Sequence, residues 1–430
     1  MKSAIKELEE KGKAAKAASR KLAFLSTEVK NKALLNIADA LIDKLNEILI
    51  ANKIDYEEAK ASGMSEAMLD RLMLSPSRLD GIAQDTKNVA ALPDPVGEEF
   101  EMRTLPNGLQ ISKRRVPLGV IGAIYESRPN VTIDISSLCL KSGNAVILRG
   151  GKEAINSNKA LVKVAQEACD RAGVPQGAIQ LIESTERTLV NHMLKMKGII
   201  DLMIPRGGAG LIKLVSENAA MPVLTGGIGV CHTYVDKSAD LNKAVAIAYN
   251  AKVQRPTVCN ALDCILVHNQ IAQAYLPAVA KEWAKAGVEM HCDKRALAIL
   301  KPIPSLKLVP AVDEDWGKEY LSLKAAIKVV DSLDEALEHI EKYGSGHSEA
   351  IVTEDHSAAT RFLNEVDAAC VYANASTRFT DGGQFGLGAE IGISTQKFHA
   401  RGPMALKELT SYKWIIWGSG QVRPQSSLLL

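Results

Sequence analysis

The 430-residue sequence lacks a large excess of charge of either sign, because 52 Lys and Arg residues stand against 50 Asp and Glu residues, and it has no long basic run. Nucleic acid and anionic membrane surfaces are therefore not expected as its main partners. It also lacks an apolar run long enough to span a bilayer. Its N-terminus mixes Lys, Glu and Ala instead of placing an apolar core after a charged start, so we expect neither a membrane segment nor a signal peptide.

The seven cysteines lack the spacing of a disulfide framework or of a zinc site. An odd number without framework spacing fits a reducing compartment, so we expect a cytoplasmic protein. Cys231 and Cys292 each adjoin a histidine, but no second pair stands at zinc-finger spacing, and we expect no metal site. Four other cysteines lie in apolar periodic segments and are predicted to be core residues: Cys139, Cys169, Cys264 and Cys370.

The length of the chain exceeds what one hydrophobic core usually supports, so we expect two or more domains. The first ninety or so residues are rich in Ala, Leu, Lys and Glu, which predicts packed helices. A break near residue 95 is followed by segment 98–111, where Asn107 and Gly108 predict the turn of a β-hairpin. From Val116 onward, strand and helix patterns alternate, and this alternation predicts an α/β fold with a parallel sheet.

The predicted strand over 199–204 runs into a glycine-rich turn that contains Gly207 and Gly208, before a predicted helix over 211–218. Such a turn can bring backbone amides to a phosphate, helped by the helix dipole. The full G-x-G-x-x-G fingerprint is absent, and similar turns are often only tight connections. Both interpretations stay open, and a dinucleotide bound here would not bind in the ordinary Rossmann manner.

Cys259 differs from the other cysteines because its neighbours are polar, charged and proline-bound. It falls between a predicted helix that begins after Asp240 and a predicted apolar strand over 261–267. Arg255 on the same loop would favour the thiolate if it lies near the sulfur. From position alone, Cys259 is either a small buried hydrophobe or a nucleophile that can attack an acyl carbon.

Several long segments together resemble one family across nearly the whole chain. They read SRPNVT from Ser127, GGIGVCHTYVD over 226–236, NAKVQRPTVCNA over 250–261, and STRFTDGGQFGLGAEIGIST followed by HARGPMALKEL over 376–409. In this order they are similar to the aldehyde dehydrogenase superfamily and, within it, to the γ-glutamyl phosphate reductase family. The resemblance gives expectations for the fold, the activity and the site residues of this chain.

The resemblance implies an α/β fold with parallel-sheet cofactor and catalytic domains and a small oligomerisation sheet. We assign residues 1–97 and 116–225 to an NADPH-binding domain and residues 226–411 to the catalytic domain. Residues 98–115 and 412–430 are assigned to oligomerisation. In the superfamily such a tail pairs with the protruding hairpin of a second subunit, so a homo-oligomer is expected.

In this family the cysteine at position 259 is the nucleophile. The resemblance implies that its thiolate attacks the acyl phosphate carbon of L-glutamyl 5-phosphate, phosphate leaves, and NADPH delivers hydride to the thioester, so that glutamate 5-semialdehyde is released in proline biosynthesis. The oxyanion needs donors, and the backbone N–H of Cys259 is the first candidate. The side chain of Asn130 is a second candidate, and its alternative role is capping or turn formation.

The sequence departs from the wider superfamily at two places, one of which concerns hydrolysis of the thioester and the other the choice of cofactor. Leu224 stands where hydrolytic members carry a glutamate that activates water, so hydrolysis of the thioester would lack a general base. Arg149 to Lys152 stands where the superfamily usually reads K-P-S-E, and Lys152 in place of the glutamate favours NADPH over NADH. Glu319 resembles the carboxylate that holds the nicotinamide ribose. The alternatives are that Lys152 is a solvated helix start and Glu319 an ordinary surface charge.

Substrate recognition needs cations, because glutamyl phosphate carries an α-carboxylate and a phosphoryl group. Five residues in family-like motifs are candidates, and each has a structural alternative: Arg128, His232, Arg378, His399 and Arg401. Glutamate 5-kinase is the implied upstream enzyme, because an acyl phosphate is labile and its transfer would benefit from proximity; no kinase segment is expected within this chain.

Three other functions remain compatible with the residues. A phosphorylating dehydrogenase for another acyl substrate would keep Cys259 and NADPH but reject glutamate semialdehyde. A dehydrogenase that acylates coenzyme A would also lack the general-base glutamate. A catalytically idle scaffold with the same fold would fail to bind NADPH.

Overall fold

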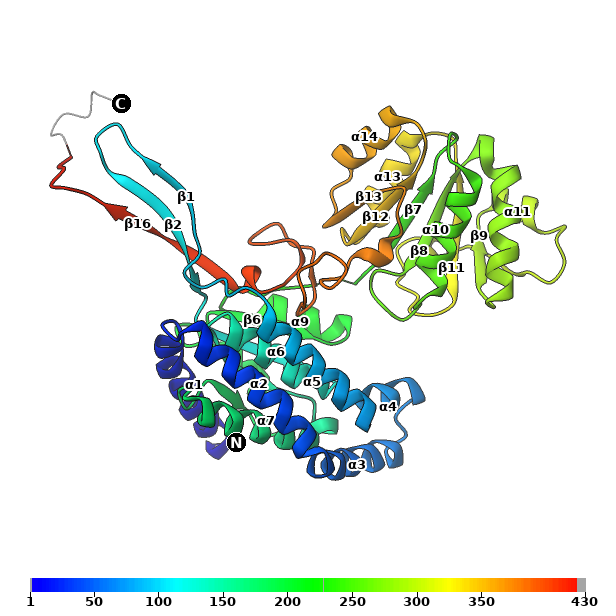
Figure 1. The fold of residues 1–430 in the computed structure, drawn as a ribbon. Helices are drawn as coiled ribbons and strands as arrows, with labels where there is room; N and C mark the ends of the chain where they lie inside the picture. The colour runs from blue at the N-terminus through cyan, green and yellow to red at the C-terminus, as the bar shows by residue number, and fades with distance from the viewer. Residues whose placement is uncertain (1, 227, 424–430) are drawn as a thin grey trace. The chain divides into compact units, whose positions relative to one another are not determined.

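The computed structural model describes residues 2–226 and 228–423, which form two compact units (Figure 1). The first unit takes in the described residues up to Leu224, Leu387–Ile391 and the described part of 405–430. The second unit consists of the described residues of Thr225–Gly386 and of Gly392–Met404. Gly227 and residues 424–430, which belong to predicted segments, lie outside the described residues. No helix of the described chain is both long and apolar enough to cross a bilayer.

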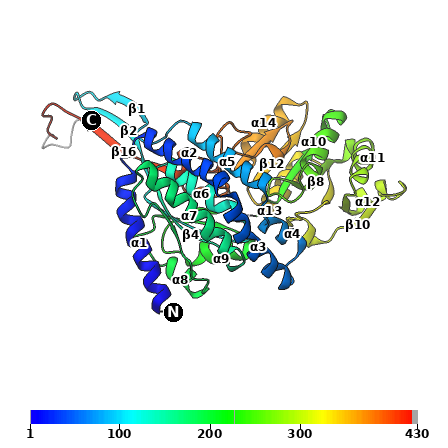
Figure 2. The same ribbon diagram turned by 60° about the horizontal axis from the view of Figure 1, so that its bottom comes forward.

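The N-terminal part of the first unit is helical, as predicted. Ser26 and Ser75 begin two of its helices by accepting hydrogen bonds from the backbone N–H groups of Val29 and Arg78. Figure 2 shows α2 beside α5 and α7, against which it packs. The helices are α1 (Lys2–Leu22), α2 (Thr27–Asp43), α3 (Leu45–Ala61), α4 (Glu66–Leu72) and α5 (Pro76–Ala91).

A four-stranded parallel sheet in the order β5-β4-β3-β6 forms the centre of the first unit. The prediction of alternating strands and helices is confirmed here, including the closure of α7 by Gly173 in the left-handed conformation. Helix α9 begins at Ala209, two residues before the predicted start. The strands are β3 (Val120–Tyr125), β4 (Ala145–Arg149), β5 (Ile179–Leu181) and β6 (Leu202–Arg206), and the helices are α6 (Asn130–Lys141), α7 (Ile155–Ala172), α8 (Thr188–Met193) and α9 (Ala209–Asn218).

The predicted hairpin is present as β1 (Glu99–Thr104) and β2 (Gln110–Pro117), with Gly108 at φ 85° and the Asn107 side chain accepting from the Leu109 N–H. The tail forms β16 (Thr410–Trp417), and the expected pairing with another subunit's hairpin stays a prediction. In this structure β16 pairs antiparallel with β2 of the same chain, so one chain builds a three-stranded sheet in the order β1-β2-β16. The N–H and C=O groups that β16 turns toward β2 are thus satisfied without a partner chain.

A seven-stranded parallel sheet in the order β10-β9-β11-β8-β7-β12-β13 forms the second unit, with helices on both faces (Figure 1). A short antiparallel pair, β14 (Ile393–Ser394) and β15 (Gly402–Pro403), accompanies it. The strands are β7 (Cys231–Val235), β8 (Leu262–His268), β9 (Glu289–Cys292), β10 (Lys307–Pro310), β11 (Lys324–Val330), β12 (Ser348–Val352) and β13 (Cys370–Ala373), and the helices are α10 (Leu241–Val253), α11 (Asn269–Lys285), α12 (Lys294–Leu300), α13 (Leu333–Tyr343) and α14 (His356–Glu365).

Alternation along β8 divides the core of the second unit into two clusters. Ile265 and Val267 pack with α10, α11 and α12 around the buried Trp283. Cys264 and Leu266 point to the opposite face, where α13 and α14 cover the sheet. Because both faces are covered, β8 is buried along its whole length, as its apolar sequence predicts.

Candidate active site

Cys259 lies in the turn between α10 and β8, as the sequence predicts. Asp240 caps α10 by accepting from the Lys243 N–H, and the helix ends at Val253, so the segment that carries Cys259 is irregular backbone. Of the seven cysteines, which all lie in the described residues, Cys259 alone is partly exposed and the other six are buried. The four cysteines predicted to be core residues are confirmed as buried, and Cys259 is the most exposed of the seven.

The loop before β7 packs directly against the backbone of Cys259. Gly229 lies so close that a Cβ atom placed on it would overlap the Cys259 carbonyl oxygen. The Cys231 Sγ lies 3.2 Å from the same oxygen. Glu319 accepts a hydrogen bond of 3.0 Å from the Gly229 N–H. Within the second unit, Gly229 thus contacts both Glu319 and the backbone of Cys259. Only glycine fits at position 229.

A second set of contacts holds the other side of the Cys259 turn. The Asn260 amide donates to the Thr380 carbonyl at 2.9 Å, and the Thr377 hydroxyl donates to the Asn260 carbonyl at 2.7 Å. The Arg378 guanidinium donates to the Asn260 side-chain oxygen and to Gln254 Oε1. The segment around Arg378, which carries a short 3₁₀ helix over Thr377–Phe379, therefore fixes the residue that follows Cys259.

Positive charge gathers beside Cys259. Burial lowers the pKa of Arg378, the nearby Arg255 lowers it further, and the charges of Asp381 and Cys259 oppose this change. Arg378 stays a cation at neutral pH because a guanidinium does not lose its proton in proteins. A cation near a thiol favours the thiolate, which is the nucleophilic form, and Arg378 is such a cation for Cys259.

The other predicted substrate residues of the second unit make contacts of their own. His232 is fully buried, and its Nδ1 lies 3.0 Å from Glu349 Oε2. Arg401 forms an ion pair of 2.6 Å with Asp367. His399 is exposed, with φ at 75°. Arg378 is thus the predicted substrate cation of this unit whose contacts at the Cys259 turn are described above.

In the first unit, the predicted cofactor residues follow the carboxyl ends of β4 and β6, which are parallel strands on either side of β3 and end at one edge of the sheet. Arg149 ends β4, and Lys152 is exposed at the start of a 3₁₀ helix over Lys152–Ala154. Gly207 and Gly208 follow β6 and are exposed. The fold therefore brings these four residues to the same edge of the sheet.

Charged groups at this edge partly fit a bound phosphate. The buried Arg149 guanidinium donates to the carbonyls of Gly150 and Thr185, and its Nε has no hydrogen-bond partner among the described residues. Burial lowers the pKa of Arg149, which remains a cation. The Gly208 N–H is occupied, because it donates to Glu126 Oε2 at 3.0 Å. Arg149 and Lys152 fit an anionic group, whereas the Gly208 amide becomes available only when Glu126 moves.

Asn130 and Arg128 follow β3 at the same edge of the first unit. Asn130 is the first residue of α6, and its amide donates to Asp134 Oδ2 at 2.8 Å. Burial raises the pKa of Asp134 to about 7, although the hydrogen bond from Asn130 opposes this change. Arg128 is half-buried. Sequence reasoning missed Asp134, Glu126 and Gly229, whose roles arise from contacts that no local pattern signals.

Comparison with known proteins identifies the family. The sequence model of the aldehyde dehydrogenase family matches residues 2–298. The chain belongs to this family. A relative from Dehalococcoides mccartyi named gamma-glutamyl phosphate reductase is 64% identical over 423 residues, which cover 98% of this chain and 100% of the relative. A relative of the same name from Caldanaerobacter subterraneus is 57% identical, over 97% of this chain and 100% of the relative.

Solved structures agree with this membership. The crystal structure of gamma-glutamyl phosphate reductase from Thermotoga maritima is similar with a TM-score of 0.94 and 50% identity, over 97% of this chain and 100% of that chain. An acetylating aldehyde dehydrogenase from Geobacillus thermoglucosidasius, at 18% identity and a TM-score of 0.70, covers 98% of this chain and 99% of that chain and shares the fold. The predicted aldehyde dehydrogenase-like α/β fold is confirmed, and the chain is a member of the gamma-glutamyl phosphate reductase family, whose superfamily uses a nicotinamide cofactor.

Proposed function

We propose that this chain reduces L-glutamyl 5-phosphate to L-glutamate 5-semialdehyde with NADPH and releases phosphate, which is the second step of proline biosynthesis from glutamate. The observation that carries the proposal is the 64% identity to a gamma-glutamyl phosphate reductase over the full length of that relative. The placement of Cys259 supports it, since this residue is partly exposed and the Arg378 cation lies near it. The chemistry then depends on what these residues can do.

The first half of the reaction forms a bond to Cys259. Its thiolate attacks the acyl carbon of the substrate, the bond between that carbon and the phosphate oxygen breaks, and inorganic phosphate leaves with the electron pair. A thioester on Sγ remains. The Cys259 backbone N–H and the Asn130 amide are the proposed donors to the oxyanion that forms on the carbonyl oxygen.

The second half of the reaction regenerates the thiolate. When bound, NADPH supplies a hydride to the thioester carbonyl carbon. The carbon–sulfur bond then breaks, the electron pair returns to Cys259 Sγ, and the aldehyde is released. Leu224 stands where a water-activating glutamate would be, so a carboxylic acid product is disfavoured.

We assign cofactor binding to the first unit. Arg149, Lys152 and the turn at Gly207 and Gly208 are proposed to hold the anionic part of NADPH, and the positive charge of Lys152 supports a preference for the 2′-phosphate. Glu319, in the second unit, is proposed to accept hydrogen bonds from the nicotinamide ribose. Because Glu319 also accepts from Gly229, it would connect cofactor binding to the loop that packs on Cys259.

Among the proposed substrate cations we place Arg378 first, because its contacts lie at the Cys259 turn. Arg128, His399 and Arg401 stay candidates for the carboxylate or the phosphoryl group. We leave His232 out of the proposed substrate site, because its ring is fully buried against Glu349. The substrate would therefore meet guanidinium groups, which can bind a carboxylate or a phosphate through two hydrogen bonds.

We further propose that the chain forms a homo-oligomer in the cytoplasm. The β1-β2-β16 sheet exposes several large apolar side chains, and its outer strands leave backbone groups available for pairing. The exposed residues are Met102, Tyr412, Trp414, Ile416 and Trp417. Association with glutamate 5-kinase is proposed on the lability of the acyl phosphate that the two enzymes would share.

The test is phosphate-dependent reduction of NADP⁺ by the purified protein with glutamate 5-semialdehyde. We expect activity that requires phosphate and that falls by several orders of magnitude in Cys259→Ala. Cys292→Ala is the matched control, because Cys292 is buried on β9 among core residues and should leave turnover unchanged. Equal activity without phosphate would contradict the proposal, and coenzyme A replacing phosphate would identify an acylating dehydrogenase instead.

A further inference from the structure

Three polar side chains form a row across the parallel sheet of the second unit. His232 on β7 is paired in register with Cys264 on β8 and with Glu349 on β12. Paired residues of neighbouring parallel strands point to the same face of the sheet. Helix α13 covers that face and contributes His339. The exposed fractions of His232, Cys264, His339 and Glu349 are 0, 0, 3 and 1%, so all four are removed from solvent.

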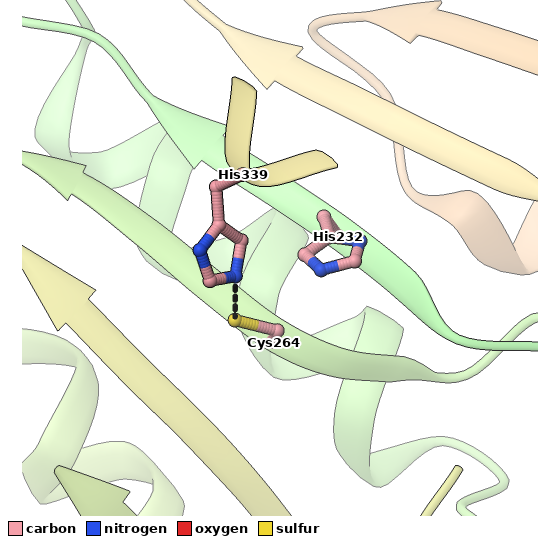
Figure 3. Close-up of side chains that lie close together, drawn as sticks. All are labelled: His232, Cys264 and His339. Atoms are coloured by element: carbon pink, nitrogen blue, oxygen red, sulfur yellow. Dashed lines mark hydrogen bonds between the residues drawn. The ribbon is translucent and has the colours of Figure 1, made fainter. Parts of the chain in front are cut away.

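The possible ligand atoms of this cluster converge (Figure 3). A ring nitrogen of His232, the Cys264 Sγ and a ring nitrogen of His339 all lie within 4.8 Å of one another. The distance from Cys264 Sγ to His339 Nε2 is 3.8 Å. Tetrahedral zinc, with bonds of about 2.0 Å to nitrogen and about 2.3 Å to sulfur, would set these two atoms about 3.5 Å apart. Small side-chain adjustments would therefore bring Cys264 Sγ and His339 Nε2 to the separation that zinc requires.

His232 is already oriented as a metal ligand. Its Nδ1 lies 3.0 Å from Glu349 Oε2, while its Nε2 is buried without a hydrogen-bond partner among the described residues. Metal-binding histidines usually hold a carboxylate with the nitrogen that does not bind the metal. A buried, unsatisfied ring nitrogen is otherwise unfavourable, so an ion at this position would remove an existing cost.

Aromatic side chains pack around His339, and the nearby charge of Lys328 opposes the binding of an ion. Its ring makes contacts with Trp316 at 5.6 Å and with Tyr343 at 4.7 Å between centroids. The Lys328 Nζ lies 3.2 Å from His339 Nδ1. Binding an ion through Nε2 requires a proton on Nδ1, and Lys328 would then turn toward Glu335, whose Oε1 lies 3.6 Å from Nζ. Lys328 thus weakens the site as it stands.

We propose that His232, Cys264 and His339 form a binding site for a thiophilic divalent cation, with Zn²⁺ as the best match. Sulfur and imidazole ligands favour zinc over magnesium and calcium, which prefer oxygen. Binding would release the Cys264 thiol proton and any proton on His232 Nε2, and the thiolate with the Glu349 carboxylate would balance the two positive charges. The bound ion would tie β7 and β8 to α13 and stabilise the second unit. The sequence gives no indication of this site, and the expectation of no metal site would then be wrong.

The test uses the full chain, freed of metal with a chelator and kept reduced with a phosphine. Titration with Zn²⁺ should show one bound equivalent and a rise in melting temperature. Co²⁺ should give a sulfur-to-cobalt charge-transfer band. Cys264→Ser should bind at least tenfold more weakly and lose the band, while Cys292→Ser, a buried cysteine of the same sheet, should bind as before. Lys328→Gln should bind more tightly, because it removes the opposing charge.

Two further variants separate a loss of folding from a loss of binding and show where the ion binds. His339→Gln replaces Cys264→Ser if that variant does not fold, and it should weaken binding to a similar extent. Cys259→Ala should bind as the unmodified chain does, because Cys259 is not part of the cluster. No binding by the folded chain would overturn the proposal. Binding that survives in Cys264→Ser and His339→Gln but is lost in Cys259→Ala would overturn it too, because the ion would then lie at the proposed nucleophile.

Discussion

At the scale of single residues, close backbone packing fixes the position of Cys259. Gly229 touches the Cys259 carbonyl, and Asn260 is held by Thr380 and Arg378. A nucleophile must meet its carbonyl carbon at a defined distance and direction, and a misplacement of about 1 Å can cost about 100-fold in rate. The geometry of Cys259 therefore depends on neighbours that take no part in the chemistry.

Substituting Gly229 by alanine tests this dependence. The added Cβ overlaps the Cys259 carbonyl oxygen, so the turn must shift and kcat should fall by about 100-fold. Gly81→Ala is the control, because a Cβ on this α5 residue meets nothing within 4 Å and its backbone is helical. Steady-state kinetics with circular dichroism would separate the two variants. Unchanged kcat in a folded Gly229→Ala protein would contradict a role of this packing in positioning Cys259.

The partly buried carboxyl of Asp134 predicts a pH-dependent stability. Its pKa in the fold is raised to about 7 from an ordinary value near 4, so its favourable contribution is complete below about pH 4 and is lost as pH rises to about 7. Asp134→Asn keeps an oxygen that accepts from Asn130 and does not ionise. Relative to this variant, the wild-type free energy of unfolding should fall by roughly 1–3 kcal/mol between pH 4 and pH 7.

Denaturant titrations of both proteins across this pH range measure the difference. Other titrating groups are common to the two proteins and cancel. A difference that stays constant with pH would mean that Asp134 ionises in the fold at its ordinary pKa.

At the scale of elements, strand ends determine where the proposed cofactor groups lie. Residues after β3, β4 and β6 meet at one edge because these strands are parallel neighbours. The sequence predicts a parallel sheet from the alternation of strands and helices, but not the order of its strands. It does not predict that Glu126 accepts from Gly208, because that contact joins two strand ends far apart in the chain.

Lys152→Glu tests the cofactor preference at this edge. Reversing the charge beside a bound 2′-phosphate should raise KM for NADPH about tenfold and reduce the preference over NADH. Lys53→Glu, an exposed residue of α3 in the same unit, applies the same change in net charge. KM values for both cofactors are the measurement. Equal effects of the two substitutions would refute a specific role for Lys152.

The exposed apolar surface of the β1-β2-β16 sheet allows a test of the proposed homo-oligomer. Ile416 is 60% exposed on β16, and Lys113 lies over the rings of Tyr412 and Trp414 on the same strand. Ile416→Lys should leave the subunit folded but shift the proposed homo-oligomer toward the monomer, since it places a charge on the apolar surface. Light scattering after size-exclusion chromatography gives the mass. An unchanged mass would exclude Ile416 from the interface.

At the scale of the whole molecule, local sequence patterns predict most helices and strands, whereas tertiary contacts determine which distant side chains come together. The capped helix before Cys259, the buried strand after it and the hairpin at Asn107 can be predicted from spacing and turn residues. The cluster of His232, Cys264 and His339 cannot, because its members are far apart in sequence and meet only through strand register and helix packing. The residues of the tail strand likewise do not determine which strand it pairs with.

The thioester on Cys259 is the central claim, and mass spectrometry of the trapped enzyme tests it most directly. The protein would be mixed with glutamate 5-semialdehyde and NADP⁺ without phosphate, quenched in acid and digested. We expect a glutamyl adduct on the peptide that contains Cys259, stable in water and removed on addition of phosphate. An adduct on another cysteine, no adduct at all, or an adduct lost equally fast without phosphate would contradict the claim.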